Sequence, residues 1–136
     1  MSLRETFWPL LGNWTGVERL ASGQNARAMI VFKLDVRDRV VVQDYRQVGD
    51  GGEEYSSHGV FMLDPDSSGL LWWLFDSTGR LPGPARGAWS DGELILPVDG
   101  TQHHFAVVEE QLRYRITSPE TEAVQLSGSY RRVSGH

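Results

Sequence analysis

The chain contains no cysteine among its 136 residues, and it has no long run of apolar residues. The lack of cysteine excludes disulfide bonds, thiolate nucleophiles and cysteine-based zinc sites. A helix that crosses a bilayer needs roughly 20 consecutive apolar residues, and no segment approaches that length. The N-terminus also lacks the charged-then-apolar pattern of a signal peptide. Cytoplasmic residence is the default expectation for such a chain.

Positive charge is scarce as well. The sequence has 13 Lys and Arg residues against 18 Asp and Glu residues, which gives a formal net charge of -5 at pH 7. Affinity for nucleic acid comes mainly from basic side chains that neutralise phosphates, so this balance argues against a nucleic-acid partner. The basic residues are also scattered along the chain, which argues against binding to an anionic membrane surface.

The rest of the composition is typical of a soluble globular protein, with 40% hydrophobic and 23% charged residues. A chain of this length is long enough to bury a core or to wall a single cavity. We therefore predict that residues 1–136 form one domain.

Only the start of the sequence has a helical pattern. Ser2–Glu5 has the spacing of a capping box, in which a hydroxyl side chain precedes a Glu by three residues. Pro9 and Gly12 limit this helix to about two turns. Its apolar residues are Phe7, Trp8, Leu10 and Leu11. A segment this apolar is expected to pack against the body of the domain as a plug.

From Trp14 onward the hydrophobic pattern alternates with a period of two, which predicts about ten short strands. The predicted strands are Trp14–Ala21, Arg27–Asp35, Arg39–Val48, Glu54–Leu63, Leu70–Ser77, Gly87–Ser90, Glu93–Val98, His103–Val108, Leu112–Thr117 and Ala123–Arg132. Turn signals separate many of them, at Ser22-Gly23, Asp50-Gly51-Gly52, Asp64-Pro65-Asp66 with Gly69, Pro82-Gly83-Pro84, Asp91-Gly92 and Asp99-Gly100.

The connections between these strands are too short for crossover helices, so neighbouring strands are expected to be antiparallel. Strands in up-and-down order would leave two exposed sheet edges, and closure into a barrel removes both. We therefore predict an all-β fold, a single closed up-and-down antiparallel β-barrel of about ten strands with a short N-terminal helical plug. A barrel of this size has room for side chains and one small ligand.

The two ends of the predicted barrel carry a pair of motifs that resembles the calycins. Gly12-Asn13-Trp14 begins the first strand and Arg131-Arg132 ends the last, similar to the Gly-x-Trp and C-terminal Arg of that superfamily of lipocalins, fatty-acid-binding proteins and nitrobindin-like haem barrels. The resemblance implies that Trp14 plugs the closed end and that a basic side chain of the final strand packs across it. A guanidinium on an indole face is physically favourable.

The middle of the chain resembles an uncharacterised bacterial lipocalin-like domain family more specifically. The similar stretches are "VVQDYRQ", "SSHGVFMLDPDSSGLLWWLFDSTGR", "PARGAW", "LRYRI" and "GSYRR". This resemblance implies a barrel architecture and ligand binding, with no particular reaction. Two features of the relatives are missing: the helical pair of fatty-acid-binding proteins and the long Pro-containing loop of nitrobindins.

Mixed polarity on the strand faces favours a cavity over a fully packed core. Arg46 and Asp44 share one face of the third strand, and Gln43 and Tyr45 share the other. A buried polar group without a partner costs roughly 1–3 kcal/mol, so neither face suits a packed interior. Arg46 either points into a site or forms a solvated pair with Asp44. On the fourth strand, His58 lies on the more polar face and Phe61 on the other, and His58 is either a pocket residue or a structural one.

The stretch "LLWWLFDSTGR" holds further candidates. One of Trp72 and Trp73 must face inward, because neighbouring residues of a strand point to opposite faces. Asp76 shares a face with Trp72. An inward Asp76 would act as an acid or hydrogen-bond donor, whereas the alternative is that Asp76–Gly79 simply forms a turn.

Later segments add two more candidates for the cavity wall and one for a polar anchor. Arg86 and Trp89 follow the Pro-Gly-Pro loop, where Arg86 either meets a ligand carboxylate or is a surface charge. Tyr114 lies on the face opposite Arg113 and Arg115, so one of these two sets faces inward. His103 and His104 are adjacent on one strand, point to opposite faces and cannot share a metal ion inside the barrel. We expect no metal.

These observations favour a non-enzymatic protein that binds an apolar or amphipathic molecule, such as a fatty acid or an aromatic acid, in the barrel. The expected walls are Phe61, Trp72 or Trp73, Trp89 and Tyr114, with polar anchors among Arg46, His58, Asp76 and Arg86. We expect no cofactor, and a monomer or a homodimer.

Three alternatives stay open. The first is a haem barrel, with His58, His103 or His104 as the proximal ligand. The second is a small enzyme that uses Asp76 or His58 as acid or base. The third is a packed barrel that serves as an interaction module through an exposed Trp patch.

Overall fold

The computed structural model describes residues 2–67, 69–79, 83–121 and 123–134. A short helix precedes a series of strands, which are α1 (Leu3–Phe7), β1 (Gly12–Leu20), β2 (Asn25–Asp35), β3 (Val40–Gly49), β4 (Glu54–Leu63), β5 (Leu70–Asp76), β6 (Ala85–Ser90), β7 (Glu93–Val98), β8 (Thr101–Val108), β9 (Gln111–Thr117) and β10 (Val124–Ser134). Each strand pairs antiparallel with its neighbours in sequence, and β1 also pairs with β10. The predicted closed antiparallel barrel is confirmed.

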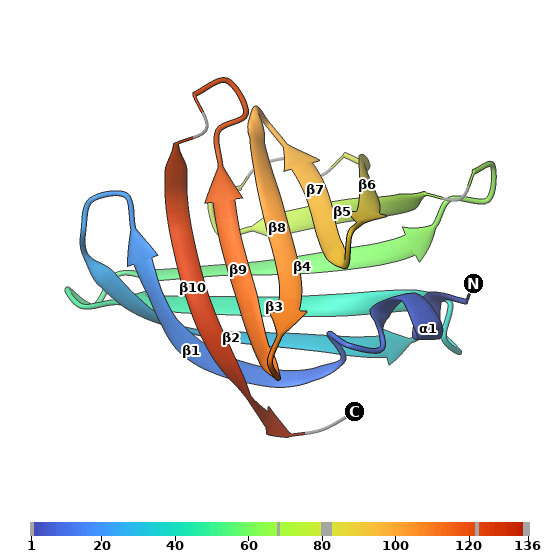
Figure 1. Ribbon diagram of the computed structural model, residues 1–136, viewed down its shortest axis with the longest axis horizontal. Helices are drawn as coiled ribbons and strands as arrows, with labels where there is room; N and C mark the ends of the chain where they lie inside the picture. Colours follow the sequence, from blue (N-terminus) through green and yellow to red (C-terminus); the bar gives the residue numbers. More distant parts are fainter. Residues whose placement is uncertain (1, 68, 80–82, 122, 135–136) are drawn as a thin grey trace.

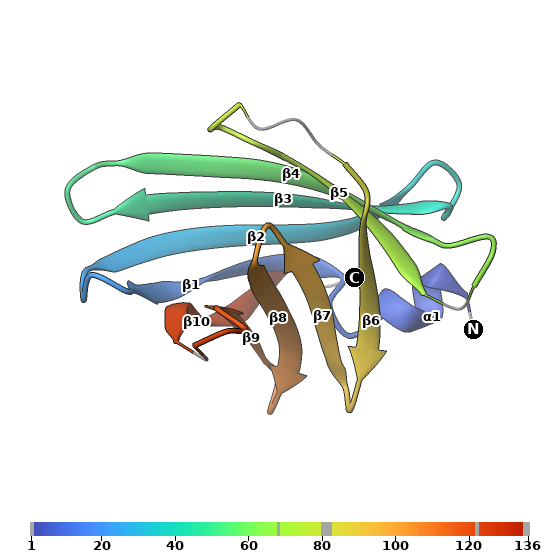
Figure 2. The same cartoon turned by 90° about the horizontal axis from the view of Figure 1, so that it is seen from above.

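The wall of the barrel folds into two crossing layers. In Figure 1, β2, β3 and β4 run across the view, whereas β7 to β10 run up it. Figure 2, seen from above, places β2, β3 and β4 on one side and β6, β7 and β8 on the other. The helix α1 lies at one end, and the hairpins β1–β2 and β3–β4 turn at the opposite end. The interior between the layers therefore has a helix-covered end and a far end.

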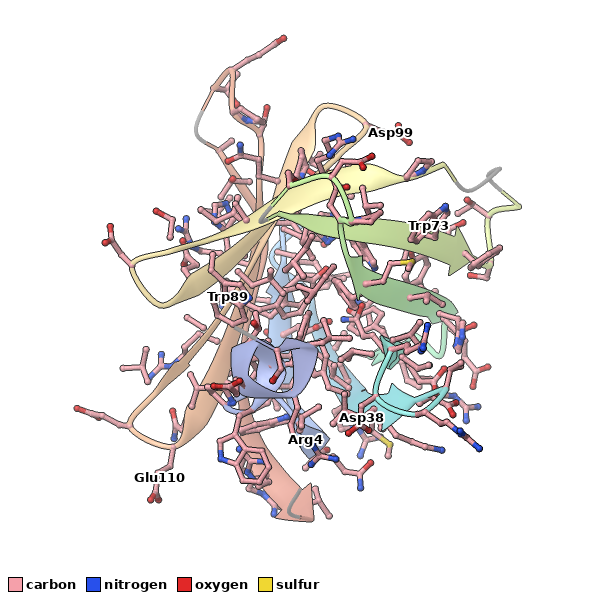
Figure 3. The ribbon with its side chains drawn as sticks, turned by 90° about the vertical axis from the view of Figure 1, so that its right-hand side faces the viewer. Arg4, Asp38, Trp73, Trp89, Asp99 and Glu110 are labelled. Carbon is pink, nitrogen blue, oxygen red and sulfur yellow. The ribbon has the colours of Figure 1, made fainter. Side chains whose placement is uncertain are left out.

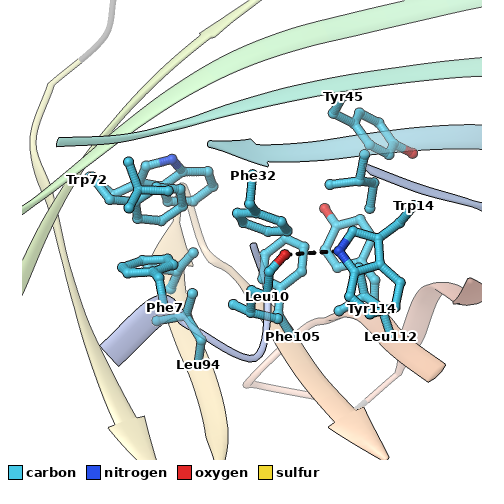
Figure 4. Packing of buried hydrophobic residues seen from close by; sticks show 14 of the residues in the cluster. Phe7, Leu10, Trp14, Phe32, Tyr45, Trp72, Leu94, Phe105, Leu112 and Tyr114 are labelled. Atoms are coloured by element: carbon cyan, nitrogen blue, oxygen red, sulfur yellow. Dashed lines mark hydrogen bonds between the residues drawn. The ribbon is translucent and has the colours of Figure 1, made fainter. Parts of the chain in front are cut away.

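Alternation along each strand decides which side chains fill this interior. In β2, Ala26, Ala28, Ile30 and Phe32 are buried, and the residues between them are exposed or half-buried. This period of two is what a strand with one face on a core requires. The apolar core lies toward α1, where rings from several strands meet (Figure 4).

Two predicted hairpin turns have the expected backbone. Asp91-Gly92 joins β6 to β7 and Asp99-Gly100 joins β7 to β8, each with two positive φ angles (52° and 77°, and 45° and 79°). Asp-Gly suits such turns because both central residues must adopt φ above zero. Glu109 and Glu110 form a similar turn between β8 and β9, with φ of 53° and 67°. No glycine marks that turn in the sequence. Within the predicted loop Pro82–Pro84, Pro82 lies outside the described residues.

The helix α1 plugs one end of the barrel, as predicted. Its capping box is formed, since the Glu5 amide donates to Ser2 Oγ at 3.1 Å and the Ser2 amide donates to Glu5 Oε1 at 3.1 Å. Phe7 is fully buried and packs on Phe61 with ring centroids 5.0 Å apart. Arg4 bonds Asp38 in the β2–β3 turn at 2.9 Å (Figure 3). In the described part of the chain, no helix is long and apolar enough to cross a membrane.

Trp14 and Arg132 hold the plug to the barrel. The buried Trp14 donates its indole N–H to the Leu10 carbonyl at 2.8 Å, a bond drawn in Figure 4. The Arg132 guanidinium carbon lies 4.3 Å from the centre of the Trp14 ring. Arg132 also donates to the carbonyl oxygens of Leu11 and, at 3.0 Å, of Pro9. The predicted packing of a terminal arginine on Trp14 is thus present in Arg132.

Arg131 is a correction to the predicted motif. Its side chain is exposed, because β10 turns neighbouring residues to opposite faces and Arg132 takes the inner one. Gly12 begins β1 with a φ of 126°, a backbone angle that favours glycine.

The pairing of β5 with β6 is short. It covers only Leu70–Trp72 and Ala85–Gly87, whereas β4 pairs with β5 from Ser57 to Leu63. Among the described residues, Trp73–Asp76 have no ladder partner on the β6 side. The ladder between β6 and β7 is equally short among the described residues, since it runs from Ala88 and Ile95 to Ser90 and Glu93.

We expect Arg132→Ala to lower the free energy of unfolding by about 2 kcal/mol, because it removes a cation–π contact and two hydrogen bonds to backbone carbonyls. The neighbouring Arg131→Ala is the matched control and should change stability by less than about 0.5 kcal/mol. Urea denaturation followed by Trp fluorescence measures both. Equal losses in the two variants would contradict the assigned role of Arg132.

Candidate functional site

The barrel contains a cavity of about 230 Å³ on the far side of the core from α1. Its lining combines aromatic, polar and aliphatic side chains from several strands. These are Leu20, Gln43, Tyr45, Gln47, Tyr55, Ser57, Trp72, Leu74, His103, Phe105, Tyr114, Ile116 and Leu126. Such a mixture, apolar walls with a few convergent polar groups, is typical of small-molecule sites.

Stacked rings form the base of the cavity. The Trp72 indole lies parallel to Phe61, with centroids 5.4 Å apart, and Phe61 belongs to the core below. Phe105 stacks on Tyr114 at 4.3 Å. Figure 4 shows Trp72 on one side of the core and the Phe105 and Tyr114 rings on the other. Because Phe61 and the core support these rings, the base is fixed before any ligand arrives.

Three tyrosines, Tyr45, Tyr55 and Tyr114, also line the cavity. The ring centroids of Tyr45 and Tyr55, and of Tyr45 and Tyr114, are each 5.9 Å apart, with the rings edge-on. Their hydroxyl groups are all engaged: Tyr45 donates to Glu18 at 2.6 Å, Tyr55 donates to Asp76 at 3.2 Å, and Tyr114 lies 2.7 Å from His103 Nδ1. What these tyrosines present to the cavity is therefore mainly the ring.

A buried carboxylate stands behind the tyrosines. Glu18 has no solvent exposure, yet it accepts hydrogen bonds from Tyr45, from Gln47 Nε2 at 2.7 Å, and from the Tyr130 hydroxyl. Glu18 is the acceptor in all three of these hydrogen bonds. Tyr45 and Gln47 both line the cavity, so the carboxylate lies one hydrogen bond away from it.

The environment of this network strongly raises the pKa values of its tyrosines. Burial, and after it the Glu18 carboxylate, raises the pKa of Tyr45, Tyr114 and Tyr130 well above the ordinary value of 10.0. All three tyrosines are therefore neutral hydrogen-bond donors across the physiological range.

Two polar groups near the cavity make no hydrogen bond to the described residues. Gln43 is 3% exposed and its side-chain amide has no hydrogen-bond partner within the described ranges. The indole N–H of Trp72 is buried and also unpartnered. Both lie against Gly59, where a methyl group in place of one glycine hydrogen would stand 2.5 Å from Trp72 Nε1 and 3.0 Å from Gln43 Oε1. The glycine lets these two groups approach the backbone closely.

The structure places some of the predicted ligand-binding residues inside the barrel. Trp72 and Tyr114 line the cavity, and Phe61 lies directly beneath Trp72. Trp89 faces inward but near the other end, where it meets Phe7 edge-on at 6.1 Å and borders a groove beside α1. Its indole N–H is buried and has no hydrogen-bond partner among the residues that the structure describes.

Four other predicted residues lie on the outer face and do not line the cavity. Arg46 is exposed and pairs with Glu54 at 3.6 Å, and His58 is exposed and pairs with Asp44 at 2.6 Å. Trp73 points outward from β5 (Figure 3), and Arg86 is exposed and bonds Asp64. The reason is strand parity: Tyr45, Phe61, Trp72 and Gly87 take the inner positions, so their neighbours point to solvent.

Asp76 and the adjacent histidines have mixed outcomes. Asp76 caps the turn after β5, since it accepts from the Thr78 amide at 3.1 Å, and it also accepts from the Tyr55 hydroxyl at the rim of the cavity. His103 faces the cavity, whereas His104 lies on the outer face against Glu93 and Thr117. No group of three or more His, Asp or Glu that could hold a metal ion occurs among the residues that the structure describes.

Sequence reasoning missed the polar half of the site. Glu18, Gln43, Gln47 and Tyr45 were not among the predicted binding residues, although one signal could have found the first. If Trp14 faces inward, Gly16 and Glu18 must follow it, because alternate residues share a face.

We expect the free energy of unfolding to fall as the pH rises above about 10, by up to about 1.4 kcal/mol per pH unit for each of Tyr45, Tyr114 and Tyr130. The folded protein keeps these protons while the unfolded chain releases them, so the stability is present below that pH and lost above it. Urea denaturation across an alkaline series measures the slope, which Tyr45→Phe should reduce by about a third. Tyrosinate absorbance from all three groups near pH 10 in a folded protein would contradict this.

Comparison with known proteins bears on the fold. A de novo designed fluorescence-activating β-barrel superposes with a TM-score of 0.53 at 14% identity, covering 97% of this chain and 99% of the other. A redesigned β-barrel bound to DFHBI superposes with a TM-score of 0.54 at 14% identity, covering 91% of this chain and 99% of the other. A further redesigned β-barrel superposes with a TM-score of 0.55 at 12% identity, covering 98% of this chain and 100% of the other. No protein-family model and no curated protein matches the sequence. The chain is thus similar in fold to designed closed β-barrels.

Proposed function

We propose that this protein binds one small, flat, largely apolar molecule inside the barrel and acts as a carrier or sensor rather than an enzyme. The observation that carries the proposal is the cavity itself, which has an aromatic base and an unpartnered Gln43 amide. A packed barrel would fill this space with side chains, and the Gln43 amide in the cavity wall is open to a ligand. A ligand that contacts both the aromatic base and the Gln43 amide would gain apolar contact and a hydrogen bond.

The size of the cavity narrows the ligand class. A cavity of about 150 Å³ holds benzene, and pockets for drug-sized ligands measure roughly 300–1,000 Å³. At about 230 Å³ the cavity suits a molecule of two fused rings. A long fatty acid, which the sequence favoured as one option, is a poor fit.

Haem is a poor fit as well, and we propose no cofactor for this cavity. Haem is at least as large as the ligands whose pockets exceed roughly 300 Å³. Of the described histidines, His103 faces the cavity, and its Nδ1 is bonded to Tyr114. His58 and His104 lie on the outer face.

The enzyme alternative has little support from the arrangement. His58 and Asp44 form a bonded pair, but they lie exposed on the outer face of the sheet, away from the cavity. Asp76 is engaged by Tyr55 and by its own turn.

Two further observations support the carrier proposal. Designed barrels of the same fold bind DFHBI, which is compatible with a ligand inside this one. The contact of Arg132 with Trp14 supports the proposed kinship with calycin barrels, a superfamily of ligand carriers in the main.

The test is isothermal titration calorimetry with naphthylmethanol, an uncharged two-ring probe. We expect saturable one-to-one binding, and we expect Ser57→Phe to abolish it because Ser57 lines the cavity and the added ring fills it. Ser56→Phe is the matched control, since Ser56 is exposed on the outer face of the same strand. Absence of binding, or equal binding by both variants, would overturn the proposal.

A further inference from the structure

Among the described residues, Lys and Arg side chains stay away from the cavity in the barrel. All described Lys and Arg side chains are exposed except that of Arg132, which is half-buried on Trp14 next to α1. The cavity is lined by no Lys or Arg within the part of the chain that the structure describes. A ligand carboxylate would therefore enter without a fixed positive partner, which is costly in a poorly hydrated site.

Negative charge, in contrast, lies just behind the wall. Glu18 is bonded to Tyr45 and Gln47, and Asp76 is bonded to Tyr55 at 3.2 Å. Tyr45, Gln47 and Tyr55 all line the cavity. Two carboxylates thus approach the cavity from different strands, each separated from it by one hydrogen-bonded side chain.

The aromatic rings complete the pattern. The hydroxyls of Tyr45, Tyr55 and Tyr114 are engaged, so their rings are what a ligand meets, and Trp72 adds an indole at the base. The faces of tyrosine and tryptophan rings carry negative potential and attract cations within about 6 Å. The amide of Gln43 offers one free acceptor on the same face of β3 as Tyr45.

We propose that the cavity binds an organic cation, an aromatic amine of about two rings, whose ammonium group lies among the three tyrosines and Gln43 while its rings lie on Trp72 and Phe105. This inference rests on the proposed ligand-binding function and names its ligand class. It replaces the aromatic acid expected from the sequence, because the arginines that would have held a carboxylate point outward.

The experiment compares three probes that share one ring system and differ in charge, namely naphthylmethylamine, naphthylmethanol and naphthoate, by calorimetry at neutral pH. We expect the amine to bind about tenfold more tightly than the alcohol, and the carboxylate to bind at least about tenfold more weakly than the alcohol. Amine binding no tighter than alcohol binding, or carboxylate binding as tight as alcohol binding, would overturn the cation proposal and leave the proposed function standing. If none of the probes binds, the proposed function itself fails.

Variants test whether the two carboxylates cause the expected preference for the amine probe. Glu18→Gln and Asp76→Asn should each reduce amine affinity by at least about threefold and leave alcohol affinity within about twofold. Asp76→Asn keeps the buried network intact, so it tests the proposal even if Glu18→Gln does not fold. Glu54→Gln changes the net charge equally but lies exposed on β4 beside Arg46, and it should change neither affinity. An equal loss in Glu54→Gln would show a long-range charge effect and overturn the assignment.

Discussion

The inward packing of Trp14 is the constraint on which the rest of the molecule depends. The Trp14 indole N–H is hydrogen-bonded to the Leu10 carbonyl, and the Arg132 guanidinium packs on the indole ring. These two contacts hold this face of β1 toward the interior. Gly16 and Glu18 then face the interior with Trp14. A shift of one residue would bury Val17 and Arg19 instead and bring Glu18 to the surface.

This choice of face couples the wall of the barrel to its contents. Glu18 joins β1, β3 and β10, because its partners Tyr45 and Tyr130 come from the two other strands. A buried polar network of this kind is stable only when each member has a partner, and all three donors find one. The same bonds withdraw the Tyr45 hydroxyl from the cavity and leave its ring there. The fold and the proposed ligand preference thus depend on one set of hydrogen bonds.

The sequence was sufficient for the fold because its signals are local. The period of two gave every strand to within about two residues, Asp-Gly marked two of the hairpins, and Ser2–Glu5 marked the helix start. Closure followed from the need to remove edges.

The site was harder because its partners are distant in the chain. A lone Glu on an alternating strand reads as a solvated charge, and nothing near Glu18 in the sequence indicates partners 27 and 112 residues away. For β3 and β4, polar residues occupy both faces, so Arg46 and His58 were as plausible inside as Tyr45. Only the pairing registers decide that choice, and they depend on the whole barrel.

The short seam between β5 and β6 has a kinetic consequence. Trp72, the last residue of β5 that pairs with β6, also forms part of the base of the cavity. Short ladders open locally at a lower free-energy cost than global unfolding, and β6 has only three described pairs to β5 and three to β7. Such opening would loosen the Trp72 ring, on which the proposed ligand rests. We therefore expect the residence time of that ligand to follow fluctuations at this seam more closely than the global stability to which Trp14 and Arg132 contribute.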